Sequence, residues 1–434
     1  MSKRRTDLLP ALGFLAPNFL GFLLFVAFPL IFSFVMAFTN WDLSLHNRFR
    51  PDEPLKWMWL RNFADLLEHP YFWRYFGNTL FMMLAIPVSI AGSLLLAVLL
   101  TRRLRSNSPR MRTGLAIGSI ASFLIVGLWL MASGYGLVAL VLCLLAGAII
   151  ALGFTAGTIV YRTLFYFPSF TSGVAIYLLW KQMYNPRLGP VNRILQPLLE
   201  PLEGIVAATA PWLWHAAGYA LWCLALVGVL WFGASTIRKW HERDFSFGTV
   251  LMRFVSLIVG GLIFYGLGLV LLRLPAMASA PEGLTAPNWL TNVHWAKPAI
   301  MIMGLWASVG SNNMLLYIAG ITNVPQELYE AADIDGASRW QRFWYVTWPQ
   351  LAPTTFFIVV MSVVGGLQGG FEQARTMTQG GPYGATTTLS YFIYIEGFET
   401  GRLGFASAVA WAMFAMIFVL TMFNYKFGSR YVND

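Results

Sequence analysis

The chain has 434 residues, of which 57% are hydrophobic and only 11% carry a charged side chain. Soluble globular domains contain about 45–50% apolar and about 25% charged residues, so this composition excludes an ordinary soluble domain. The formal net charge of +10 could indicate nucleic-acid binding, but no nucleic-acid motif accompanies it. Basic loops between membrane helices explain the charge better. We therefore expect an all-α membrane protein embedded in the lipid bilayer, with no nucleic acid among its partners.

Apolar residues are bunched into stretches long enough to cross a bilayer, which takes about 20 residues of α-helix. Ten such stretches occur, near residues 13–38, 76–100, 113–132, 136–157, 163–181, 213–234, 249–272, 298–320, 353–371 and 404–425. The sequence therefore predicts a polytopic helical bundle of about ten transmembrane helices.

The distribution of Lys and Arg predicts the orientation of these spans, because basic residues gather in cytoplasmic loops. With residues 3–5 placed in the cytoplasm, 17 of the 29 basic residues fall in interior connections. An even number of spans then returns the C-terminus to the same side. Both termini are expected to be cytoplasmic.

The sequence lacks the residue patterns that several other classes of protein need. No span carries an ionisable side chain near its centre, where proton pumps and ion channels need one. There is no His-Glu-x-x-His motif and no Gly-Lys-Ser/Thr phosphate loop. Cys143 and Cys223 lie in apolar runs without metal-ligating neighbours. We therefore expect a non-catalytic subunit that binds no metal and no cofactor of its own and takes its energy from elsewhere.

One interior loop, residues 322–349, has the pattern of a short helix outside the bilayer. Thr322 and Asn323 are capping residue types, and Pro325 suits a first helical turn. Gly336 is expected to end the helix, because glycine readily adopts the left-handed conformation found after helix C-termini. A glycine at that point would also let the helix rotate against the membrane spans.

The predicted helix carries a small, mostly apolar face that a partner could approach closely. Two acidic residues near its start, Glu327 and Glu330, suit the positive end of the helix dipole. The face follows the spacing i, i+3, i+4, i+7 and consists of Leu328, Ala331, Ala332 and Asp335. An ordinary interfacial loop is the alternative, but it would not need a capped helix, an alanine face and a glycine together. We expect a docking site for a partner.

The same loop resembles the signature of the permeases of binding-protein-dependent ABC importers, of the maltose and glycerol-phosphate type. Their signature is Glu-Ala-Ala, three residues, Gly, nine residues, then Ile-x-Leu-Pro. Here it reads Glu330-Ala331-Ala332, Gly336 and Val346-Thr347-Trp348-Pro349. The Ile and Leu places hold Val346 and Trp348, which depart from the signature but are apolar. The residues around the motif look like the carbohydrate branch of the family.

The resemblance implies which residues couple the chain to a cytoplasmic ATPase. At the positions that match the family's motif, the resemblance implies the coupling residues Glu327, Glu330, Ala331, Ala332, Asp335, Gly336, Ala337 and Pro349. Closure of the ATPase would be passed through this helix to the membrane spans.

Other segments resemble the family in the same order along the chain. They are residues 8–42, 62–79, 167–192 and 371–408, and with the coupling loop the likeness covers about three-fifths of the sequence. Residues 106–157 and 204–285 have no counterpart in the six-helix form, and each contributes two apolar spans. Because helices added in pairs keep every later loop on its side, residue 330 stays cytoplasmic. The expected architecture is one permease domain, a six-helix core with two extra helix pairs.

The resemblance also implies function and partners. The chain would be a permease subunit in a bacterial inner membrane, importing a carbohydrate or similar polar solute. It would act with a second homologous permease, a dimer of ATPase subunits and an external solute-binding protein. ATP and Mg would be bound by the ATPase partner.

A neutral solute needs hydrogen-bonding groups along its path at mid-depth. The candidates are Ser308, Ser311, Asn312, Asn313, Gln368 and Gln373, with Ser362 a weaker one. The alternative for each is a hydrogen bond between helices. Glu372 and Arg375 are expected to pair at the outer surface.

Two other functions stay open. A stand-alone secondary transporter or channel would need charged groups at depth and would work without an ATPase. A membrane-bound enzyme or a scaffolding subunit would need no polar path through the spans.

Overall fold

The computed structural model describes residues 8–46, 54–101, 109–131, 136–156, 158–171, 173–242, 247–280 and 283–428. These residues are mostly helical, and their extended pairing is limited to an isolated bridge between Thr39 and Trp57. The chain divides into two compact units. Unit 1 comprises Met1–Met83 and Val364–Tyr425, and unit 2 comprises Leu84–Val363 and Lys426–Asp434.

Unit 1 contains the first helices of the chain and the last ones. Its elements are α2 (Leu8–Phe22), η1 (Leu23–Ala27), α3 (Phe28–Met36), α4 (Arg61–Glu68), α5 (Phe72–Met83), α20 (Phe371–Gln373), η5 (Ala374–Thr378), α21 (Leu389–Tyr394), η6 (Ile395–Glu399) and most of α22 (Leu403–Gly428).

Unit 2 contains the middle of the chain. Its elements are α6 (Ala85–Thr101), α7 (Pro109–Leu130), α8 (Gly136–Ala156), α9 (Thr158–Tyr166), η3 (Phe167–Phe170), α10 (Gly173–Met183), α11 (Pro190–Ala208), α12 (Pro211–His241), α13 (Phe247–Ala278), α14 (Ala296–Ser308), α15 (Asn312–Thr322), α16 (Gln326–Ile334), α17 (Arg339–Arg342), η4 (Phe343–Thr347) and α18 (Trp348–Gln350). The helix α19 (Ala352–Gln368) begins in unit 2 and ends in unit 1.

The all-helical membrane fold predicted from composition is confirmed, whereas the count of ten spans is not. Within the described ranges, five helices are long and apolar enough to cross a bilayer, or seven if each of two bent pairs counts as one span. Three further predicted spans correspond to shorter apolar stretches, Ala116–Trp129, Cys143–Leu152 and Ile263–Ala278. These stretches lie within the helices α7, α8 and α13, which have 22, 21 and 32 residues, as many as the roughly 20 that match the hydrocarbon thickness or more.

Two of the helices contain π-helical turns at the same distance before a proline. The segment η1 ends two residues before Pro29, and η4 ends two residues before Pro349. In each case the residue preceding the proline donates its N–H across five residues, from Phe28 to Leu23 and from Trp348 to Phe343. Proline has no N–H and its ring crowds the carbonyl of the preceding turn, so a wider turn accommodates it.

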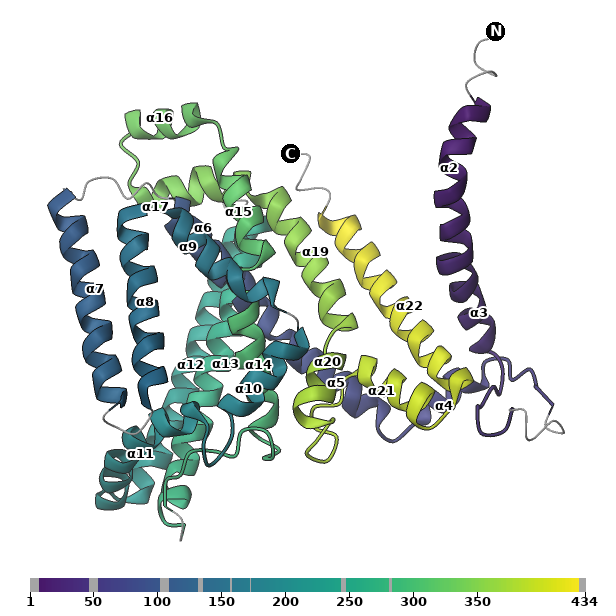
Figure 1. Cartoon of the computed structure of the whole chain (residues 1–434), viewed down its shortest axis with the longest axis horizontal. Coiled ribbons are helices and arrows are strands. Elements are labelled where there is room, and N and C mark those ends of the chain that lie inside the picture. The colour runs from purple at the N-terminus through teal and green to yellow at the C-terminus, as the bar shows by residue number, and fades with distance from the viewer. Residues whose placement is uncertain are drawn as a thin grey trace. The chain divides into compact units, whose positions relative to one another are not determined.

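The two regions without a counterpart in a six-helix permease each contain a helix hairpin. In one, α7 and α8 pack side by side, and in the other α12 and α13 do (Figure 1). Glycines permit the close approach: a Cβ added to Gly268 would lie 2.1 Å from the indole nitrogen of Trp222. That nitrogen donates to the Tyr265 carbonyl at 3.2 Å. The role of the hairpins as additions to a six-helix core stays a prediction.

The buried core of unit 2 holds both ends of the loop that carries α16. This core cluster joins residues of α6, α15, α18 and α19, namely Leu94, Ala97, Leu100, Met314, Tyr317, Ile318, Trp348, Leu351 and Ile358. The loop leaves the core after α15 and re-enters it at Trp348, so both ends of the loop have fixed positions.

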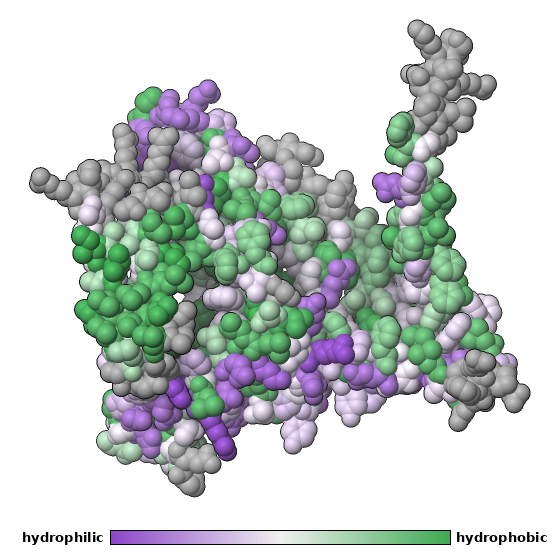
Figure 2. Space-filling view, in the orientation of Figure 1, coloured by the Kyte–Doolittle hydropathy of each residue, from purple (hydrophilic) through white to green (hydrophobic). Residues whose placement is uncertain are grey.

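The helix α16 projects from the body of unit 2, beyond the ends of α7, α8 and α15 (Figure 1). The N-terminal end of α7 and the C-terminal end of α8 lie on the same side of the unit as α16. Figure 2 shows a hydrophilic cap over α16 and a hydrophobic band over α7 and α8. This arrangement is typical of a helix that lies outside the apolar slab of a membrane protein.

Candidate functional site

The predicted helix in the loop 322–349 is present, and it starts later than expected. Thr322 is the last residue of α15 and Asn323 is the C-cap of that helix. Pro325 occupies the N-cap of α16 in an extended conformation, and the first helical residue is Gln326. Because α15 continues to Thr322, the capping residue types before Pro325 serve the end of the preceding helix rather than the start of α16.

The helix α16 ends as the glycine predicts. Gly336 has φ +71, in the left-handed region. The N–H of Ala337 donates to the Ala332 carbonyl at 2.9 Å, and the N–H of Gly336 donates to the Asp333 carbonyl at 3.2 Å. These two bonds satisfy carbonyl groups that a helix end otherwise leaves free.

The chain turns immediately into a second helix with its own cap. Ser338 forms a capping box with Gln341: the serine hydroxyl accepts the N–H of Gln341, and the glutamine side chain accepts the N–H of Ser338 at 2.8 Å. From Arg339 to Gln350 the chain is helical and leads into α19 through a bend of 65°. The residues between Ser338 and α19 are therefore mostly helical.

One face of α16 packs back on the second helix. Two residues of this inner face lie one turn apart, Tyr329 and Asp333. The Tyr329 hydroxyl and the Thr347 hydroxyl are 2.9 Å apart and share a hydrogen bond. The Asp333 carboxylate forms an ion pair with the guanidinium of Arg342.

The opposite face of α16 is exposed and combines acidic with apolar side chains. This face includes residues predicted to couple, together with an exposed apolar residue that the sequence interpretation did not single out. Ile334 is 88% exposed. The exposed residues of this outer face are Glu327, Leu328, Ala331, Ile334 and Asp335. A spacing of one helical turn relates Ile334 to the motif glutamate, which is the signal that could have identified it.

The remaining predicted coupling residues lie in the same loop. Glu330 accepts a hydrogen bond from the Gln326 side-chain amide at 3.0 Å. Ala332 is half-buried and Ala337 follows the left-handed glycine. Pro349 is exposed within α18, two residues after the last π-helical residue. Apart from Pro349, which lies in α18, the structure thus brings these residues onto one projecting helix and the turn that follows it.

Four candidate solute-path residues of unit 2 lie at a break in a membrane span. The span Ala296–Thr322 is interrupted after Ser308, where Val309 and Ser311 are extended. The intervening Gly310 has φ +91. Ser308 and Ser311 use their hydroxyls locally, since Ser311 donates to the Ser308 carbonyl at 2.7 Å. Broken helices of this kind expose backbone groups that can bind polar ligands at mid-depth.

A second broken span packs against this break within unit 2. The helices α9 and α10 meet at an angle of 95°. The hydroxyl of Tyr166, at the end of α9, donates to Asn312 at 2.9 Å. A Cβ added at Gly310 would lie 2.7 Å from the Phe165 carbonyl, so only glycine permits this approach. The span predicted near 163–181 therefore corresponds to a bent pair of helices, with Pro168 and Gly173 close to the bend.

The other two solute-path candidates, Gln368 and Gln373, belong to unit 1. Gln368 is the exposed last residue of α19, and its carbonyl accepts the Ser390 hydroxyl at 2.7 Å. Gln373 is half-buried in α20. The ion pair expected between Glu372 and Arg375 is absent from the described residues. The guanidinium of Arg375 lies instead over the ring of Tyr394, 4.3 Å from its centroid.

A loop of unit 1 that precedes α21 is held firmly by buried polar groups. The Asn78 side chain donates to the carbonyls of Gly384 and Thr387, each at 2.9 Å. The hydroxyl of Thr79 accepts the N–H of Leu389 at 3.0 Å. Asn78 is only 2% exposed. The tip residue of the same loop, Tyr383, is 86% exposed.

Unit 1 also buries a carboxylate next to a histidine. Glu396 is 4% exposed and forms an ion pair with Arg402. The ring of His69 packs on Phe392, with centroids 5.1 Å apart. Burial lowers the pKa of His69, and the positive charge of Arg402 lowers it further, whereas Glu396 opposes the shift. This cluster was not singled out in the sequence.

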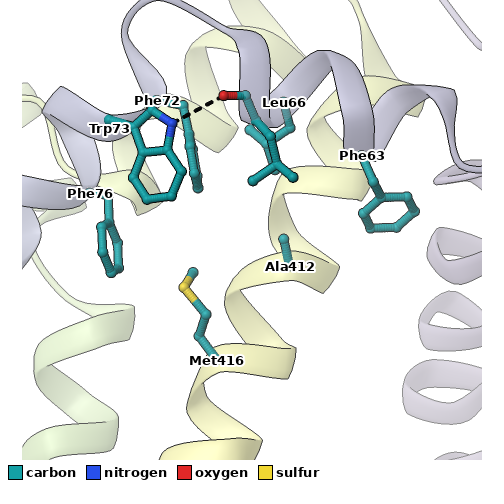
Figure 3. Close-up of a pocket in the computed structure, with 8 residues that line it drawn as sticks. Phe63, Leu66, Phe72, Trp73, Phe76, Ala412 and Met416 are labelled. Carbon is teal, nitrogen blue, oxygen red and sulfur yellow. Dashed lines mark hydrogen bonds between the residues drawn. The ribbon is translucent and has the colours of Figure 1, made fainter.

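An apolar cavity of about 260 Å³ lies in unit 1 between α4, α5 and α22 (Figure 3). The Trp73 indole at its edge donates to the Leu67 carbonyl at 3.1 Å. Its lining consists of Phe63, Leu66, Leu67, Phe72, Trp73, Phe76, Ala412 and Met416. None of the solute-path candidates lines it, and a polar solute would find no hydrogen-bonding partner among these side chains.

Within the described ranges, no group of three or more His, Cys, Asp or Glu side chains could hold a metal ion. The candidate site consists of two features of unit 2, a projecting acidic and apolar helix and a polar break in a membrane span.

Residues 144–432, more than half of the chain, match the model of a protein family described as the binding-protein-dependent transport system inner membrane component. The sequence is 27% identical over 230 residues to the arabinooligosaccharides transport system permease protein AraP of Bacillus subtilis, which covers 51% of this chain and 72% of that protein. It is 38% identical over 144 residues to the sn-glycerol-3-phosphate transport system permease protein UgpA of Rhizobium meliloti. That match covers 33% of this chain and 49% of UgpA, so this chain spans about half the length of that relative.

A longer alignment relates the chain to the probable ABC transporter permease protein YesP of Bacillus subtilis, with 23% identity over 435 residues, 99% of this chain and 93% of that protein. Among solved structures, a subunit of a bacterial ABC transporter involved in the import of the acidic polysaccharide alginate matches 98% of this chain and 96% of its own. The TM-score is 0.58 at 20% identity. A second structure of the alginate transporter, in complex with its oligosaccharide-bound periplasmic protein, matches with a TM-score of 0.56 at 19% identity. These two matches concern the fold.

Proposed function

The chain belongs to the family of binding-protein-dependent transport system inner membrane components, and from this premise we propose that it is the permease through which a carbohydrate or similar polar solute enters the cytoplasm. The observation that carries the proposal is α16: an exposed acidic and apolar face on a short helix whose loop is fixed at both ends in the core of unit 2.

The partner that fits α16 is an ATPase subunit on the cytoplasmic side. Its surface would offer an apolar socket for Ile334 and basic groups for Glu327 and Asp335, because opposite charges at the rim of an interface steer and orient docking. ATP and Mg would be bound by that partner, and this chain would do no covalent chemistry. Both termini of the chain would lie on the same cytoplasmic side.

A second, homologous permease would complete the pore, and an external solute-binding protein would deliver the solute. The similarity to permeases of sugar-type systems supports the carbohydrate class. The break at Gly310 supports it as well, because the side-chain amides of Asn312 and Asn313 can hydrogen-bond hydroxyl groups of a neutral solute. The wall formed by α9, α14 and α15 would then be the part of the path contributed by unit 2.

The competing function, a secondary transporter that works alone, has less support. The family match favours a subunit of a larger system. The projecting α16 would also have no role in a stand-alone transporter, and its exposed Ile334 would remain in water at a cost of about 25 cal/mol for each Å² of apolar surface.

The proposal is tested by purifying the tagged chain from membranes and asking whether an ATPase copurifies. We expect the wild-type chain to retain it, and Glu330→Lys and Gly336→Pro to lose it together with solute uptake. Gly336→Pro cannot adopt the left-handed conformation at this position, so it disrupts the turn after α16.

The matched control is Ser338→Thr, which keeps the cap of α17 and should leave uptake unchanged. Insertion into membranes is measured for every variant. If all variants insert and both Glu330→Lys and Gly336→Pro retain ATPase and uptake, the proposed function is wrong.

A further inference from the structure

The turn between α16 and α17 contains a glycine with a left-handed backbone, Gly336, which favours a flexible joint. Free rotation at Gly336 would weaken the coupling in a permease that is driven by an ATPase on another chain. Any push on α16 would be absorbed by rotation around this residue before it reached the membrane helices. Rotation at Gly336 is restricted only if other contacts connect the two sides of the turn.

Two side-chain contacts cross the turn. The carboxylate of Asp333, in the last turn of α16, pairs with the guanidinium of Arg342 at the end of α17. The hydroxyl of Tyr329 meets that of Thr347 at 2.9 Å. Tyr329 and Asp333 are four residues apart, so they lie on one face of α16. The two contacts are therefore in line along the helix and both reach the same neighbouring segment.

The second helix passes directly into the buried core. Thr347 is 7% exposed, and the next residue, Trp348, belongs to the core cluster of unit 2. Arg342 and Thr347 are on one continuous helical stretch, Arg339–Gln350. A displacement of α16 is thus connected to the core through side chains as well as through the backbone at Gly336.

We propose that Asp333 and Arg342 form a latch across Gly336, which makes α16 and the helix Arg339–Gln350 move as one body. The inference rests on the proposed function, since it assigns these two residues as positioning residues for the coupling between ATPase and permease. Tyr329 and Thr347 are the second, uncharged point of the latch. The latch restricts the rotation at Gly336 that the sequence alone predicts.

An exposed ion pair contributes little to folding stability, and the side chain of Asp333 is 56% exposed. Its expected effect is therefore on transmission of motion. A latch that holds only one relative orientation of two helices biases the equilibrium between coupled and uncoupled arrangements, and such biases change activity severalfold. The chain can lose the latch and still fold, insert and bind its partner.

The experiment is a charge-swap cycle in proteoliposomes containing the complete transporter. The variants are Asp333→Arg, Arg342→Asp and the double variant with both changes. For each, ATP hydrolysis and solute uptake are measured in parallel, and the number of ATP molecules hydrolysed per solute is the readout. Copurification of the ATPase with each variant is measured first.

Each single swap places two like charges together. We expect uptake to fall roughly fivefold to tenfold while ATP hydrolysis stays within about twofold, so more ATP is used per solute. The double swap restores opposite charges and should bring the ratio back to within about twofold of wild type. A merely structural role would lower hydrolysis, uptake and copurification together.

Two further variants refine the test. Asp333→Asn removes the charge but keeps the size of the side chain. It should raise the number of ATP molecules hydrolysed per solute, by less than the single swaps do. Arg339→Gln is the matched control: Arg339 begins the same short helix, is exposed, and forms no ion pair within the described ranges. It should leave the ratio unchanged.

Four outcomes overturn the latch. They are a fall of hydrolysis, uptake and copurification together, an unchanged ratio in both single swaps and in Asp333→Asn, a double swap that does not restore the ratio, and an Arg339→Gln variant that raises it as much as Asp333→Asn does. These outcomes are distinct from failure of the proposed function, in which the wild-type chain itself would bind no ATPase.

Discussion

Two loops of this protein are built in opposite ways, one around buried polar groups and the other with its side chains exposed. The loop 378–388 of unit 1 is held by buried polar groups, with Thr386, Thr387 and Thr388 each at most 3% exposed. The segment 325–338 of unit 2 projects from its core, and none of the residues of α16 is buried. One loop is fixed by its interior, whereas the other presents its side chains outward.

The chemistry of the two loops differs accordingly. Asn78 satisfies two carbonyls in the loop 378–388, and a buried group left without such a partner costs about 1–3 kcal/mol. The α16 segment is connected across Gly336 by an exposed ion pair and one hydroxyl pair, which cost little to break. Substitutions of the buried groups that hold the first loop should therefore change stability, and substitutions in the second loop should change function without changing stability.

The largest effect is expected at Ile334. Ile334→Asp puts a carboxylate in the face proposed to dock on the ATPase, where desolvating a charge is costly. ATPase copurification and uptake should fall more than about tenfold, while the thermal unfolding midpoint stays unchanged because the side chain is 88% exposed. Ile334→Leu should stay close to wild type. If Ile334→Asp lowers the unfolding midpoint, this side chain packs on the chain itself, and the contrast drawn between the two loops is wrong.

A smaller effect, on stability alone, is expected at Asn78. Asn78→Leu leaves the carbonyls of Gly384 and Thr387 without their donor, so we expect the free energy of unfolding to fall by roughly 2–4 kcal/mol. Denaturant unfolding of the purified chain measures this change. Tyr383→Asn, at the exposed tip of the same loop, should be neutral because asparagine tolerates a positive φ. Equal losses in both variants would contradict the division between buried and exposed positions.

The smallest effect concerns pH and His69. Its pKa in the folded chain lies below the ordinary value of about 6.5, chiefly through burial. The unfolded chain therefore takes up the proton first, and the stability associated with the neutral ring is present above about pH 6.5 and lost as pH falls through the folded pKa. Between pH 7.5 and pH 5, the unfolding midpoint of His69→Gln should fall less than that of the wild-type chain. A steeper loss in the variant would mean that the folded state favours the protonated ring.

Much of the helical framework was predictable, because long apolar runs leave few alternatives in a bilayer. The end of α16 was predictable too, since Gly336 is the residue that a left-handed turn favours. The breaks after Ser308 and at Phe167–Phe170 were not predicted, although Gly310 and Pro168 lie at these places and polar residues flank both. Hydropathy measures the length of a span but carries no information on where its backbone bends.

The contacts that hold the two loops were also outside the reach of a single sequence. Asn78 and Thr387 are 309 residues apart, and no periodicity relates them. Asp333 and Arg342 are nine residues apart, but they meet because the chain reverses at Gly336. A turn changes which residues are neighbours, and helical spacing predicts only neighbours within one helix.

The central claim is that α16 lies in the cytoplasm and is covered there by an ATPase. The direct measurement is labelling of Ala331→Cys by a membrane-impermeant maleimide, in a chain with Cys143→Ala and Cys223→Ala. We expect labelling in inverted vesicles but not in right-side-out vesicles, and protection in inverted vesicles when the ATPase is added. Labelling from the external side, or full reactivity with the ATPase bound, would contradict the account.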